Sequence, residues 1–183
     1  GLQKVYHATN GTPVALLDTT KAYAQDLATA GTATFRLGGA VNRDTTVVSL
    51  TSTGVLMTYT LPGGTLAQDG QFVEVECFGT TVGYVAAADG IQFRFGSTVI
   101  SAYDTFTGTG SWALRAKIIR TGAATQKCVF RWLINQDNGA VADMSDYVTS
   151  AETLSSALAI DINIAIYAGG TITQESMIVK LRG

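Results

Sequence analysis

The sequence contains few of the residues that enzymes use for catalysis. It has one histidine, His7, and two cysteines in 183 residues. A lone histidine near one end cannot serve a conventional catalytic triad built into the body of a domain. The sequence also lacks a Gly-x-Ser-x-Gly turn, a phosphate-binding loop and a His-Glu-x-x-His motif. These absences predict a protein that is not an enzyme and that carries no cofactor.

Charge is scarce as well. Charged residues make up 14% of the chain, where soluble domains typically have about 25%. Because a stable monomer usually carries more surface charge, we expect part of the surface to be covered by other subunits. The net charge is −2 and the basic residues are scattered singly along the sequence, which argues against a nucleic-acid partner. No apolar run approaches the roughly 20 residues that span a bilayer, so no membrane insertion is expected.

The two cysteines have neither the number nor the spacing of a zinc site. Cys77 and Cys128 each alternate with apolar neighbours, which predicts two buried thiols that act as small hydrophobic groups. A disulfide between the two strands remains an open alternative, because sequence alone does not fix the distance between them.

What the sequence has in abundance is the pattern of β-strands. Apolar and polar residues alternate over Ser111–Arg120 and Leu158–Ile166, and such alternation predicts strands with one buried and one wet face. In the first strand, the core face is expected to carry Trp112, Leu114, Ala116 and Ile118. Arg115 and Lys117 should then face solvent.

Frequent Gly, Pro and Asn turns separate about eight to ten such segments. Residues 41–183 are therefore predicted to form an antiparallel β-sandwich of jelly-roll type, with residues 135–157 as its longest irregular link. Residues 1–40 are expected to form an extended arm for attachment or oligomerisation. Within this arm, Leu16 and Leu17 are candidate subunit contacts, and residues 19–28 are compatible with one or two helical turns.

Two groups of acidic residues could carry chemistry. Glu74 and Glu76 share one face of a strand, where paired carboxylates can hydrolyse glycosides or simply form a wet sheet face, which is the commoner case. Asp137, Asp143 and Asp146, with Asn138, supply oxygen ligands that suit calcium. Their spacing does not match an EF-hand, and such residues are also ordinary in turns.

Aromatic residues are the candidates for ligand contact. Four fall in expected loops, where an exposed ring can stack on a sugar: Tyr84, Tyr103, Phe106 and Tyr147. Trp112 and Trp132 alternate with apolar residues, so core packing is the first interpretation and sugar stacking the alternative. Ile119 is apolar on an otherwise polar strand face, and is therefore a candidate subunit contact.

A series of short motifs resembles the jelly-roll domains of tailed-bacteriophage surface proteins, such as tail-fibre tips and head decorations. The resemblance covers about residues 45–135. Its motifs are Tyr59-Thr60-Leu61-Pro62, Thr65-Leu66, Asp69-Gly70, Phe95-Gly96-Ser97, Gly110-Ser111-Trp112 and Arg120-Thr121-Gly122. Gly96-Ser97 departs from the Gly-Gly that these domains usually show at that point.

The resemblance implies a trimeric structural protein on the virion surface, either a capsid decoration or a fibre component. Its partners would be further copies of itself and other capsid or tail proteins. The alternative that it implies is a receptor-binding tip or carbohydrate-binding module that recognises a glycan of the host cell surface. The resemblance transfers no site residue position by position.

Overall fold

The computed structural model describes residues 4–6, 13–15, 24–27, 33–36, 39–85, 90–103, 107–165 and 167–182, with side chains from Asn42 onward except at Tyr103 and Thr107. Every regular element in these residues is a β-strand. They contain no helix that is long and apolar enough to cross a membrane. The predicted all-β class is confirmed.

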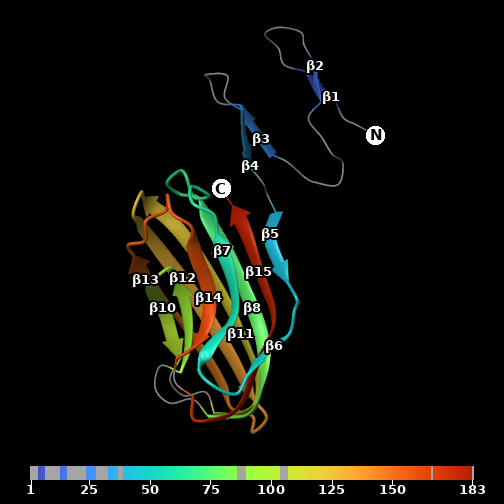
Figure 1. Cartoon of the computed structure of the whole chain (residues 1–183), viewed down its shortest axis with the longest axis vertical. Helices are drawn as coiled ribbons and strands as arrows, with labels where there is room; N and C mark the ends of the chain where they lie inside the picture. The colour runs from blue at the N-terminus through green and yellow to red at the C-terminus, as the bar shows by residue number, and fades with distance from the viewer. Residues whose placement is uncertain are drawn as a thin grey trace.

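The body is a sandwich of two antiparallel sheets that lie face to face (Figure 1). The smaller sheet has the order β10-β9-β14-β7. Its strands are β7 (Gly54–Leu61), β9 (Ile91–Phe95), β10 (Thr98–Tyr103) and β14 (Leu158–Ile164). A hairpin at Gly96-Ser97 joins β9 to β10, with Gly96 at a φ of 60°, which favours glycine.

The larger sheet has seven strands in the order β13-β12-β11-β8-β15-β5, and β6 also pairs with β15. Its strands are β5 (Gly39–Asp44), β6 (Val48–Leu50), β8 (Phe72–Val85), β11 (Thr107–Gly122), β12 (Thr125–Gln136), β13 (Val141–Ser150) and β15 (Gly169–Arg182). We call the side of this sheet that faces away from β7, β9, β10 and β14 its outer face.

The core lies between the sheets, as alternation predicts. Trp112, Leu114 and Ile118 on β11 are at most 2% exposed, whereas Arg115 and Lys117 are exposed. The rings of Trp112 and Trp132 lie 5.8 Å apart at 50° and fill the centre of the sandwich. Trp132 Nε1 donates a hydrogen bond to Ser101 Oγ at 2.9 Å, which satisfies a buried polar group. Core packing is therefore the role that the structure gives both tryptophans.

One glycine in the sheet makes room for this core. A Cβ on Gly79 would lie 2.8 Å from the Trp112 ring and 1.9 Å from the Thr173 carbonyl oxygen. No side chain fits there unless the backbone moves.

Three expectations about chain segments are wrong. Residues 135–157 are not mainly irregular, because β13 forms a hairpin with β12. β8 continues to Val85, so Tyr84 lies in a strand rather than a loop. The helical turns expected within residues 19–28 are absent from the described part, where β3 (Ala24–Leu27) pairs with β4 (Ala33–Arg36). A second hairpin joins β1 (Lys4–Tyr6) to β2 (Pro13–Ala15).

Most of the expected arm of residues 1–40 lies outside the described residues, and so do His7, Leu16 and Leu17. The boundary between arm and sandwich, and the attachment role of the arm, stay predictions.

Candidate functional site

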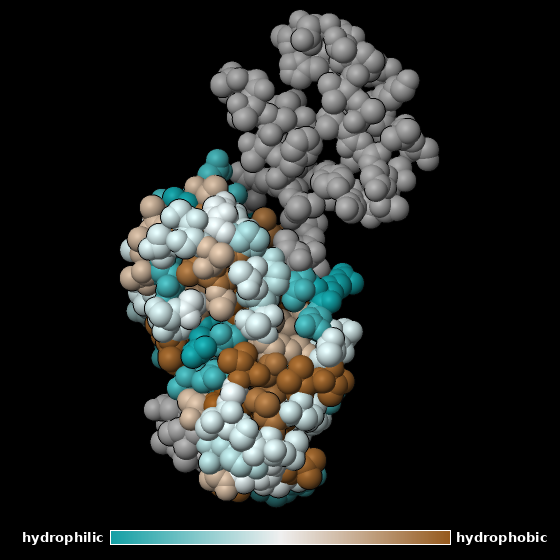
Figure 2. Space-filling view, viewed as in Figure 1, coloured by the Kyte–Doolittle hydropathy of each residue, from teal (hydrophilic) through white to brown (hydrophobic). Residues whose placement is uncertain are grey.

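The outer face of the seven-stranded sheet carries two contrasting surfaces. Figure 2 shows one face of the molecule, with an apolar patch over β6 and the adjoining part of β7. Val47, just before β6, is 63% exposed, and Val55 on β7 is 41% exposed. On the larger sheet, strand register brings residues that are far apart in sequence into rows. These rows form a charged half and an apolar half.

The charged half is made by outward residues of five neighbouring strands. Its basic members are Arg115, Lys117, Lys127, Arg131, Lys180 and Arg182. Glu74 and Glu76 lie among them on β8. Lys117 Nζ is 3.5 Å from Glu74 Oε1, Arg182 Nε is 3.2 Å from Glu74 Oε2, and Lys180 Nζ is 3.1 Å from Glu76 Oε2.

These ion pairs favour one of the two interpretations of Glu74 and Glu76. Burial alone would raise the pKa of Glu74, but hydrogen bonds from Arg182 and Lys117 outweigh it, and the pKa lies below its usual value. A general acid for glycoside hydrolysis needs a raised pKa instead. The wet-face interpretation is therefore the one that the geometry supports.

Two arginines lie directly opposite each other in this half. Arg115 on β11 is the register partner of Arg131 on β12. Arg131 Nε donates to Asp143 Oδ1 at 2.8 Å, and its Nη2 contacts the other carboxylate oxygen. Among the described residues, Arg115 makes no ion pair, although Glu76 is its partner across β8. Like charges placed opposite each other on a sheet repel, so the Arg115–Arg131 pair is unfavourable by itself.

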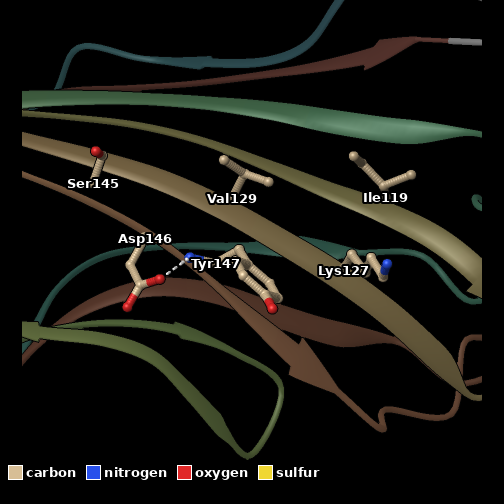
Figure 3. Close-up of a pocket in the computed structure, with 6 residues that line it drawn as sticks. All are labelled: Ile119, Lys127, Val129, Ser145, Asp146 and Tyr147. Carbon is tan, nitrogen blue, oxygen red and sulfur yellow. Dashed lines mark hydrogen bonds between the residues drawn. The ribbon is translucent and has the colours of Figure 1, made fainter.

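Two shallow hollows lie on the charged half. One, of about 460 Å³, is lined by Ile119, Lys127, Val129, Ser145, Asp146 and Tyr147, and Figure 3 shows these side chains across β11, β12 and β13. The second, of about 470 Å³, is lined by charged side chains that include Arg115 and Arg131. Val129 and Ser145 line both, so the two hollows adjoin.

The apolar half lies toward the other end of the same strands. Phe78, Ala113 and Leu133 are register neighbours on β8, β11 and β12. Phe78 is 48% and Leu133 38% exposed, and Val82 and Val141 nearby are each 65% exposed. Thr80 and Ser111 form the next row of register partners, and Asp143 is the register partner of Leu133 on β13. Exposed apolar side chains that adjoin in this way mark interaction surfaces more often than single ones do.

The predicted ligand-contact residues do not come together. Tyr84 is fully buried, its ring lies 6.3 Å from that of Tyr167, and burial raises its pKa to about 12, so its assignment to a binding loop is wrong. Tyr147 is 65% exposed, but it lies on β13 rather than in a loop. Phe106 and the side chain of Tyr103 lie outside the described residues.

The structure does not bring the three calcium candidates together. Asp137 lies in the turn after β12, whereas Asp143 and Asp146 are three positions apart on β13 and so point to opposite faces. Asp143 is held by Arg131, and Asp146 Oδ1 accepts from the Tyr147 N–H at 2.7 Å. The described residues contain no cluster of three or more His, Cys, Asp or Glu that could hold a metal.

Both cysteines are buried free thiols, as predicted. Burial raises the pKa of Cys77, and it raises the pKa of Cys128 to about 11. Neither thiol is therefore an activated nucleophile.

Ile119 is partly buried at the edge of the first hollow, beside Lys127 and Val129. Its role as a subunit contact stays a prediction. Sequence reasoning missed Phe78, Leu133 and the Arg115–Arg131 pair. Alternation placed them outward, but only the register between strands shows that they adjoin.

Comparisons with known proteins give little for this chain. No family model and no curated protein matches it. Among solved structures it is similar to a peanut lectin with a nine-residue peptide, at 11% identity and a TM-score of 0.34 over 87% of this chain and 89% of that one. A likeness this distant carries no argument about function.

Proposed function

We propose that this chain is a structural, non-catalytic protein on the surface of a tailed-bacteriophage particle, and that it assembles as a homotrimer through the apolar half. The observation that carries the proposal is the row of Phe78, Ala113 and Leu133, which leaves two large apolar side chains 48% and 38% exposed on a rigid sheet. Exposure of such apolar surface to water is unfavourable, and burial in a subunit interface removes this cost.

Other features support this role. Charged residues form only 14% of the chain. The motif series over residues 45–135 supports a virion setting, in which residues 1–40 would attach the sandwich to capsid or tail proteins.

Light scattering coupled to size exclusion tests the assembly. The wild-type chain should give three times the 19.2 kDa chain mass at micromolar concentration. Phe78→Glu combined with Leu133→Glu should give the monomer mass with an unchanged β spectrum. Val99→Glu is the matched control, because Val99 is 43% exposed on β10 of the other sheet. A monomeric wild type, or a double variant that stays assembled, would contradict the proposed interface.

The setting has its own test. Antibodies against the sandwich should label purified phage particles on their surface, and labelling that is absent from intact particles would contradict a virion role.

The second candidate is a receptor-binding tip or carbohydrate-binding module. It is favoured by Tyr147, whose exposed ring adjoins a hollow with polar groups at its margin. A glycan array would reveal such binding. An array without any bound glycan would contradict this second candidate.

A further inference from the structure

We propose that the charged half of the outer face binds an acidic polysaccharide, a chain of sugar rings that carry carboxylates. This inference rests on the second candidate function and names its ligand class. It does not depend on the trimer interface, which we place on the other half of the face.

The local charge of this half differs from the charge of the whole chain. The whole chain has a net charge of −2. Most basic side chains that the structure describes nevertheless point outward from the larger sheet. Glu74 and Glu76 are occupied by Lys117, Arg182 and Lys180. Arg115 and Lys127 make no ion pair with any described residue, so this half carries an excess of positive charge.

Arg115 and Arg131 form an opposed pair of like charges on β11 and β12. Residues directly opposite on antiparallel strands have Cβ atoms about 4.5–5.5 Å apart, and like charges at that distance are destabilising. Asp143 pairs with Arg131, and Glu76, the neighbour of Arg115 on β8, pairs with Lys180, which leaves Arg115 without an ion pair among the described residues. A ligand carboxylate that entered the adjoining hollow could accept forked hydrogen bonds from the Arg115 guanidinium and relieve the repulsion.

The hollow beside the arginine pair offers an aromatic and aliphatic surface. The Tyr147 side chain is 65% exposed, with Val129 opposite it in register and Ile119 one strand further on (Figure 3). An exposed aromatic ring beside aliphatic groups can pack against the C–H face of a sugar. Because this hollow adjoins the arginine pair through Val129 and Ser145, one ligand can contact both.

The chemistry favours a polysaccharide over a nucleic acid. Duplex DNA carries a negative charge about every 1.7 Å and needs a dense basic surface. Here Glu74 and Glu76 line the same hollow as the arginines and would repel closely spaced phosphates. A polysaccharide with at most one carboxylate per sugar ring alternates negative charges with apolar ring faces. The protein surface likewise has the arginine pair beside the apolar side chains of the first hollow.

Isothermal titration calorimetry with four probes tests the ligand class. The probes are polygalacturonate oligomers, neutral dextran, polyglutamate and a short DNA duplex. We expect binding of the polygalacturonate only, and weaker binding at high salt. Equal binding of dextran would overturn the role of the arginines. Equal binding of polyglutamate or DNA would overturn the assignment to a polysaccharide, and no binding of polygalacturonate would overturn the proposal.

Matched variants then locate the site. Arg115→Gln should weaken polygalacturonate binding about tenfold, as expected for the loss of a charge-assisted contact. Arg43→Gln is the control, because Arg43 is exposed on the same sheet, makes no ion pair with described residues, and lies on β5 beyond β8 and β15. Equal losses in both variants would show general attraction by charge and contradict a site at Arg115.

The aromatic contribution is tested in the same assay. Tyr147→Ala should weaken binding about tenfold, whereas Tyr147→Phe should retain it, because the ring face rather than the hydroxyl makes the contact. Unchanged binding in Tyr147→Ala would contradict the stacking role. All four variants should keep the wild-type mass in light scattering, which separates a failure of ligand binding from a failure of assembly.

Discussion

The inner and outer faces of the seven-stranded sheet are made by alternate residues of the same strands. The two faces differ in what they require of a side chain. On the inner face, Leu114 and Trp132 are fully buried and need only be apolar and of the right size. On the outer face, Arg115, Lys117 and Glu74 stay wet, and what matters is which residue lies beside which. The apolar character and size of the side chains therefore decide how well the inner face packs. On the outer face, strand register decides which side chains a ligand or partner meets together.

A matched pair of leucines should separate the two faces most strongly. Leu114→Asp places an unpaired carboxylate in the core and should cost about 4 kcal/mol or more of unfolding free energy. Leu133→Asp introduces the same group on the outer face and should cost the isolated fold less than about 1 kcal/mol. Urea unfolding at several protein concentrations measures both, since a loss of assembly appears as concentration dependence. Equal costs would remove the distinction between faces.

A pair of aromatic residues should show the next largest difference. Trp112→Ala removes a ring that is 2% exposed and packs against Trp132, so we expect a loss of about 3–5 kcal/mol. Tyr147→Ala removes a ring that is 65% exposed and should cost less than about 1 kcal/mol. Denaturant midpoints compare them, and a costly Tyr147→Ala would mean that this ring supports the fold rather than a ligand.

Acid should act on the outer face. The pKa of Glu74 is lower in the folded chain than its ordinary value of 4.5, so its ion pairs contribute stability above that pH. That contribution is lost as the pH falls through the folded-state pKa. Glu74→Gln should therefore flatten the fall of unfolding free energy below about pH 5. Asp137→Asn controls for the loss of one negative charge, and an unchanged slope in Glu74→Gln would contradict the ion-pair origin.

The smallest effects are expected from two charged residues of the outer face. Arg115→Ala and Lys117→Ala should each change the unfolding free energy by no more than about 0.5 kcal/mol. The Lys117 side chain is 53% exposed, so its contact with Glu74 is well solvated. Its ammonium group also lies 5.2 Å from the centroid of the Phe72 ring. Thermal melts of both variants check this. A large loss would show that the outer charges hold the sheet together.

Much of the fold could be predicted from the sequence because alternation is a local signal. β11 contains the expected strand Ser111–Arg120, and β14 begins at Leu158 as expected. β13 was not predicted, because it is an edge strand and its alternation is broken where Asp146 takes an inward position and Tyr147 an outward one. Tyr84 was misplaced because Gly83 beside it suggests a turn, whereas long-range pairing with β11 and β15 extends the strand.

The neighbours within the candidate site do not follow from the local sequence pattern. The sequence by itself determined the strand class, the buried set on β11 and the two inert thiols, because burial follows from side-chain chemistry and a period of two. Only the tertiary structure decided that Arg115 faces Arg131, that Phe78 adjoins Leu133 across Ala113, and that Tyr147 borders an apolar hollow. Such neighbours come from strand order and register, which depend on pairings between segments that are distant in the chain.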